Sequence, residues 1–132
     1  MQEPKAKEIQ VPVSAGELLD KLTILEIKME RIDDPEKLGN VAKELALLKA
    51  IHDTQIIADQ KALTLTDALR NINQKLWDVE DELRAFEAKS IFDTSFVEKA
   101  RSVYKLNDQR ANLKRQLNVH LKSELIEEKS YG

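Results

Sequence analysis

The clearest hydrophobic pattern in the chain lies between residues 65 and 86. Apolar residues recur there at alternating spacings of four and three, which places them on one face of an α-helix. The alternation has no exception and is typical of the seam of an antiparallel coiled coil or a helical bundle. We therefore predict a helix over 66–89. The seam consists of Leu65, Leu69, Ile72, Leu76, Val79, Leu83 and Phe86.

Similar stripes predict three further helices, near residues 15–32, 35–62 and 95–121. Each predicted start carries residues that can cap the free backbone N–H groups of a first helical turn. These are Ser14 with Glu17 in a capping box, Asp34 with Pro35, and one of Asp93, Thr94 and Ser95.

The boundary between the second and third helices is weakly marked, because no Gly or Pro occurs between residues 40 and 89. The stretch "LTLTD" at 63–67 contains β-branched and capping residues, which favour a turn. We predict the break there. The competing interpretation is one continuous helix across this region.

The whole pattern predicts an all-α fold: a four-helix antiparallel bundle or a set of long helical hairpins. The short connections at 33–34 and 90–94 force antiparallel neighbours, and the third and fourth helices form one hairpin. We expect a single helical domain over 9–123, after a disordered segment over 1–8 and before a tail over 124–132. Only three Gly and three Pro in 132 residues agree with a helical protein.

The first predicted helix is apolar on two sides, because Ile24 and Ile27 lie outside its main stripe. Such a helix is either the central helix of a bundle or part of a dimer contact. Trp77 likewise lies outside the seam of the third helix, and Trp is enriched at protein contacts. We expect a homodimer, with Trp77, Ile24 and Ile27 at its interface.

Composition excludes several classes of function. The net charge of −3, from 24 acids and 21 bases mixed along the chain, argues against nucleic-acid binding. The absence of Cys excludes disulfides, thiolate nucleophiles and cysteine zinc sites. No apolar run is long enough for a membrane span and the first residues have no apolar core, so we expect a cytoplasmic protein with no membrane insertion.

Two polar residues stand in the apolar stripe of the fourth helix. Arg110 lies seven residues from both Val103 and Leu117, and Asn107 precedes it by one turn. A buried guanidinium needs a partner, and we expect a carboxylate from the third helix, Glu80 by preference or Glu82. The alternative is that Arg110 binds an anionic ligand with help from Asn107 and Tyr104. We favour the structural network, because such networks often fix the register of bundles.

Acidic pairs three residues apart suggest a different chemistry. Glu17 with Asp20, and Asp78 with Asp81, each share a helical face. All-α nucleotide pyrophosphohydrolases of the MazG-like kind hold Mg²⁺ with Glu-x-x-Asp helices, and Mg²⁺ prefers carboxylate oxygens. However, the Glu-Glu-x-x-Glu element of those enzymes is missing here, so solvated surface acids are the better interpretation.

Cationic and nucleophilic groups give no stronger signal. Lys21 and Lys28 share a face and could contact phosphate, although an ion pair with Glu17 explains Lys21 equally well. The two histidines, His52 and His120, come from different helices and belong to no metal-binding or catalytic motif. No residues are candidates for catalysis, and we expect no cofactor, with Mg²⁺ as the alternative.

Four stretches together resemble a family of small bacterial proteins of unknown function. They are "VPVSAGELLDKLTILEIKMERI", "LWDVEDELR", "FVEKARSVYKLNDQRANLKRQLN" and "EEKSY", within residues 11–131. The resemblance implies a link to surface polysaccharides, because such proteins are often encoded near glycosyltransferases. It supplies no catalytic or binding residues.

We therefore expect a non-catalytic helical interaction or accessory protein with a possible protein partner, linked to bacterial envelope-polysaccharide metabolism. The alternative is a Mg²⁺-dependent nucleotide or nucleotide-sugar pyrophosphohydrolase that uses Glu17 and Asp20.

Overall fold

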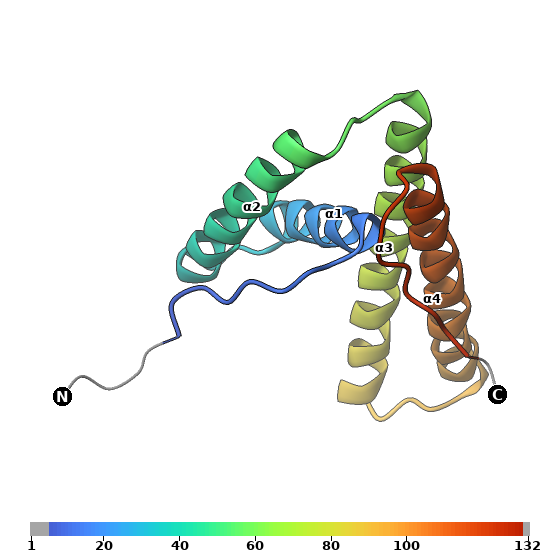
Figure 1. The fold of residues 1–132 in the computed structure, drawn as a ribbon. Helices are drawn as coiled ribbons and strands as arrows, with labels where there is room; N and C mark the ends of the chain where they lie inside the picture. The colour runs from blue at the N-terminus through green and yellow to red at the C-terminus, as the bar shows by residue number, and fades with distance from the viewer. Residues whose placement is uncertain (1–5, 131–132) are drawn as a thin grey trace.

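The computed structural model describes residues 6–130, and this part of the chain folds into four α-helices (Figure 1). Their bounds are α1 Ala15–Arg31, α2 Pro35–Gln55, α3 Gln60–Ala88 and α4 Thr94–His120. The predicted all-α fold of helices packed against one another is confirmed. Residues 1–5 of the segment predicted to be disordered, and residues 131–132 of the tail, lie outside the described residues.

The four helices are arranged around α1. This helix packs against α2, α3 and α4, whereas within residues 6–130 α2 packs against α1 alone (Figure 1). α3 and α4 form the predicted antiparallel hairpin and pack against each other more extensively than any other pair. The two apolar sides of α1 are therefore explained by its central place between α2 and the hairpin.

The helix starts follow from the capping residues that the sequence contains. The Ser14 hydroxyl accepts the N–H of Glu17 at 3.1 Å, and the Asp34 carboxylate accepts the N–H of Glu36 at 3.0 Å. Of the three candidates before α4, Asp93 is the cap. The capping box at Ser14 is only half formed, because the Glu17 carboxylate contacts lysines instead.

The predicted break at 63–67 is wrong, and so is the continuous helix. The chain leaves helical geometry at residues 56–59, and Asp59 caps α3 by accepting the N–H of Ala62 at 2.9 Å. Thr64 and Thr66 lie inside α3, where their hydroxyls donate to the carbonyl four residues earlier, at 3.0 and 2.7 Å. This local bond lets threonine occupy a helix interior. The aspartate cap therefore decides the boundary.

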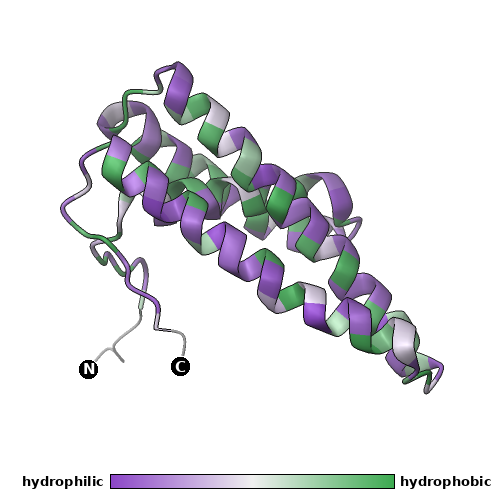
Figure 2. Ribbon diagram, turned by 90° about the vertical axis from the view of Figure 1, so that its right-hand side faces the viewer, coloured by the Kyte–Doolittle hydropathy of each residue, from purple (hydrophilic) through white to green (hydrophobic). Residues whose placement is uncertain are grey.

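The core lies where α1 meets the proximal half of the hairpin. Its buried cluster consists of Leu18, Leu19, Leu22, Ala62, Leu69 and Leu117, with Leu45, Leu48 and Ile56 from the α2 side packed against it. From Trp77 to Gln116 no residue is buried, although apolar residues continue along both helices to the hairpin end (Figure 2). No helix within residues 6–130 is long and apolar enough to cross a membrane.

α1 and α4 approach each other closely at Gly16. Its N–H donates to the Asn118 side-chain oxygen at 2.6 Å, and that amide is 1% exposed. A Cβ at Gly16 would overlap the Lys114 carbonyl oxygen, whereas a Cβ at Gly39 in α2 would meet nothing. The contact therefore depends on the missing side chain at Gly16.

We predict that alanine has opposite effects at these two glycines. Gly39→Ala raises the free energy of unfolding by about 0.5–1 kcal/mol, because alanine is the better helix former. Gly16→Ala lowers it by about 1–3 kcal/mol, because helix α4 must move away from the new methyl group. Urea unfolding followed by circular dichroism measures both, and equal stabilisation by the two variants would contradict the close approach.

Candidate functional site

Arg110 forms an ion pair with Asp20 of α1. Its Nε donates to one carboxylate oxygen at 2.9 Å, and a terminal nitrogen donates to the other. Asp20 is 1% exposed, and the Arg110 side chain is 30% exposed. The predicted partners were wrong: Glu80 is exposed, and Glu82 pairs with Lys99 at 2.8 Å. The reason is that α1 packs against this face of α4, so α1 supplies the carboxylate.

A polar network surrounds this ion pair. The Asn73 side-chain nitrogen of α3 donates to the Asp20 carboxylate and to the Thr23 hydroxyl, each at 2.9 Å. The Thr23 hydroxyl in turn donates to the Asp20 carbonyl at 2.8 Å. Arg110 also donates to the Asn107 side-chain oxygen, at 3.5 Å. Within residues 6–130, no buried side-chain nitrogen or oxygen lacks a hydrogen-bond partner. The network is therefore closed.

Tyr104 does not join this network. Its side chain is exposed at 53%, and it lies one turn before Asn107 on the part of the hairpin that extends beyond the core. Asn107 is within reach of Arg110, as predicted, but Tyr104 is not a member of a shared anion site.

A second charged cluster lies one turn further along α4. The Lys114 ammonium contacts Glu17 at 2.5 Å and Glu127 of the C-terminal tail at 3.2 Å. Burial lowers the pKa of Lys114, but the hydrogen bonds to these two carboxylates outweigh it and leave the pKa raised. For Arg110, the hydrogen bonds to Asp20 raise the pKa above its ordinary value despite burial. Both cations therefore stay charged at neutral pH.

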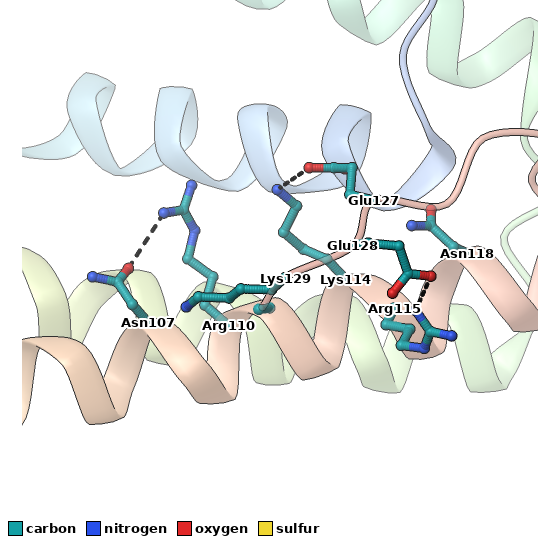
Figure 3. Close-up of a pocket in the computed structure, with 9 residues that line it drawn as sticks. Asn107, Arg110, Lys114, Arg115, Asn118, Glu127, Glu128 and Lys129 are labelled. Carbon is teal, nitrogen blue, oxygen red and sulfur yellow. Dashed lines mark hydrogen bonds and ion pairs between the residues drawn. The ribbon is translucent and has the colours of Figure 1, made fainter. Parts of the chain in front are cut away.

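The C-terminal tail crosses α4 beside these clusters and borders an open cleft of about 240 Å³ (Figure 3). Arg110 and Lys114 point from α4 toward α1, and the tail passes next to them. Glu127 accepts a hydrogen bond from the Ser14 hydroxyl at 2.7 Å, and Glu128 pairs with Arg115 at 2.9 Å. Carboxylates of the tail therefore occupy Lys114 and Arg115, whereas Arg110 is occupied by Asp20 of α1.

The acids of the magnesium alternative are bound by cations. Asp20 holds Arg110, and Glu17 holds Lys114 and, at 3.6 Å, Lys21. Asp78 on the hairpin is bound by Arg31, and Asp81 beside it is exposed. Residues 6–130 contain no group of three or more His, Cys, Asp or Glu side chains that could hold a metal ion. The two acidic pairs do not converge.

The remaining residues that the sequence analysis assigned to a site do not lie together in one place. Lys21 is exposed and pairs with Glu17, and Lys28 is half-buried two turns further along α1. Ile27 is only 1% exposed, so its predicted place in a dimer interface is wrong: it is part of the interior of a single chain. Ile24 and Trp77 are half-buried, and their place at an interface stays a prediction.

Sequence analysis placed Asp20 among solvated surface acids, or with Glu17 in a magnesium site, and so missed its role as the buried partner of Arg110. Asp20 lies among leucines on a helix that is apolar on two sides, and this was a usable signal that its carboxylate is buried. Asn73 gave a weaker signal, because it stands next to the seam residue Ile72. The contacts of Glu127 could not be predicted from hydrophobic periodicity, because the tail that carries Glu127 is not helical.

The fold and site define a small all-α protein with a polar network whose buried atoms are all hydrogen-bonded, and with no group of three or more metal-ligating side chains among residues 6–130. A family model described as a family of unknown function (DUF6165) matches residues 9–132. The chain belongs to this family, which covers nearly its whole length. Comparisons with curated proteins and with solved structures find no match.

We predict that the tail loosens around Glu127 when this residue loses its charge. Burial raises the pKa of Glu127, but the hydrogen bonds from Ser14 and Lys114 outweigh it and hold the pKa below its ordinary value of 4.5. The attachment is therefore fully present above pH 4.5 and is lost as the pH falls through the lower value in the folded protein. Glu127→Gln should loosen the tail from Ser14 and Lys114 at neutral pH, while the pairs of Glu128 with Arg115 and of Lys129 with Asp108 remain.

Backbone NMR signals of residues 124–130 measure this loosening. Glu124→Gln is the matched control, because Glu124 is an exposed acid of the same tail. Tail signals that stay unchanged in Glu127→Gln, or that move equally in the control, would show that Glu127 does not hold the tail.

Proposed function

We propose that this protein is a cytoplasmic, non-catalytic interaction module that acts as a homodimer and presents the end of its hairpin to protein partners. The observation that carries this proposal is the distal hairpin, defined as residues 77–106, in which no residue is buried by the rest of the described chain. Two helices alone cover only part of each other's apolar stripes, whereas a four-helix arrangement encloses them.

The distal hairpin has the composition of a contact surface. Phe92, Val97 and Tyr104 are 56%, 50% and 53% exposed, and Trp77 is half-buried. Aromatic residues are enriched at protein interfaces. The hairpin end is also held together, because the Phe96 ring makes edge-to-face contacts with Phe86 and Phe92 at centroid distances of 6.3 and 5.2 Å. Because these rings are already packed against one another, binding of a partner at this end would cost little further conformational entropy.

The first partner is a second copy of this chain, whose distal hairpin has the same uncovered stripes. Pairing of two hairpins as a coiled coil would supply the four helices that enclose both sets. The closed Asp20 network supports a role without catalysis, since its charged groups are held by one another. The resemblance described above supports a place in bacterial envelope-polysaccharide metabolism.

We predict that charge placed on the distal hairpin dissociates the dimer. Val97 and Tyr104 lie seven residues apart on one face of α4, so a Val97→Glu/Tyr104→Glu variant puts two like charges at the contact. The expected result is a dimer for the unchanged protein and a monomer for this variant, measured by light scattering over a concentration series.

The matched control changes Leu47→Glu and Ile51→Glu, two exposed apolar residues on one face of α2. It should remain a dimer. An unchanged protein that is monomeric into the millimolar range, or a control that dissociates equally, would overturn the proposed contact.

A further inference from the structure

An apolar pocket lies on the other side of α1 from the Arg110 network, where α2 and α3 diverge. Its volume is about 220 Å³, and its lining comes from α1, α2, α3 and the connection at 56–59. The floor is part of the core: Leu19, Leu22 and Ala62 are between 2% and 6% exposed. The walls are Leu45 and Ile56. The backbones of α2 and α3 do not approach each other closely in the described chain, so the space between them is bounded by side chains.

The rim of the pocket is polar and carries more positive than negative charge. Lys49 and His52 come from α2, Arg70 from α3 and Glu26 from α1. Arg70 and Glu26 pair with each other at 2.7 Å, and His52 contacts Asp53 beside it. Lys49 has no ion pair with any residue between 6 and 130. The rim therefore offers one ammonium group over an apolar floor.

We propose that this pocket binds a small amphiphilic anion: an apolar chain or ring enters between α2 and α3, and its anionic head group is held at the rim by Lys49. Ligand sites in proteins have this construction, with an apolar lining and a few polar groups that fix orientation. The volume corresponds to roughly seven water molecules at ~30 Å³ each, which fits a medium-length alkyl chain rather than a long lipid. No residue of the distal hairpin lines this pocket, so binding here is independent of the proposed dimer contact.

Straight-chain carboxylates provide the probe. Octanoate should bind saturably to the full-length protein, in isothermal titration calorimetry and in NMR of methyl groups. The perturbed signals should be those of Leu19, Leu22, Leu45 and Ile56. Affinity should increase about fourfold for each methylene from pentanoate to octanoate, the factor expected for burying a CH₂ group, and then level off as the pocket fills. Octanol, which lacks the charge, should bind up to about fivefold more weakly.

Three variants test the assigned groups. Lys49→Gln should weaken octanoate binding up to about fivefold and leave octanol binding unchanged, whereas Lys43→Gln, on the same helix outside the pocket, should change neither. Thr66→Leu places a larger apolar side chain in the pocket and should abolish binding of both probes. Circular dichroism confirms that each variant is folded.

Three results would overturn the proposal. The first is the absence of saturable binding. The second is an affinity that does not depend on chain length, or methyl perturbations outside the pocket. The third is pocket methyl signals that shift with protein concentration while octanoate has no effect, because the occupant would then be a second copy of the chain.

Discussion

The ion pair between Asp20 and Arg110 is the interaction on which the arrangement of this protein depends. It joins the central helix to the hairpin, at a point where the aspartate is almost wholly inaccessible to water. A buried carboxylate is tolerated only when a cation and hydrogen-bond donors surround it, and here Arg110 and Asn73 provide both. Arg110 lies on α4 and Asn73 on α3, so their bonds to Asp20 fix α1 against both of these helices. The register of the bundle follows from it.

The contacts on either side of this pair follow the same register. Gly16 brings the backbones of α1 and α4 together at one end, and Glu17 meets Lys114 between that contact and the ion pair. In the distal hairpin no residue is buried, although Arg31 of α1 still contacts Asp78 at its proximal end. The molecule thus has a proximal part organised by buried charge and a distal part in which two helices share a half-covered seam. The functional proposals concern the distal surface and the pocket beside α2, because the central charges are already neutralised within the chain.

Much of the fold was predictable because helical periodicity and caps are local signals. The unbroken seam of α3 and the caps at Ser14 and Asp34 determined helices that the structure contains. The break between α2 and α3 was predicted too far along the chain. The hydroxyls of Thr64 and Thr66 bond to carbonyls of their own helix, so these residues do not form a turn. No hydrophobic pattern indicated that Asp59 caps α3. The need for a partner at Arg110 was also predictable. The identity of that partner was not, because it depends on which helix lies over α4.

A double-mutant cycle on Asp20 and Arg110 tests this account most directly. Arg110→Leu leaves a buried, charged Asp20 and should lower the free energy of unfolding by about 3–5 kcal/mol, whereas adding Asp20→Leu should restore most of that loss. The same cycle on the exposed pair of Arg31 and Asp78 is the control and should give a far smaller coupling, because solvent screens an exposed ion pair. Urea unfolding followed by Trp77 fluorescence measures both cycles. Losses that simply add in the Asp20–Arg110 cycle, or a cost for Arg110→Leu no larger than in the control, would contradict the central claim.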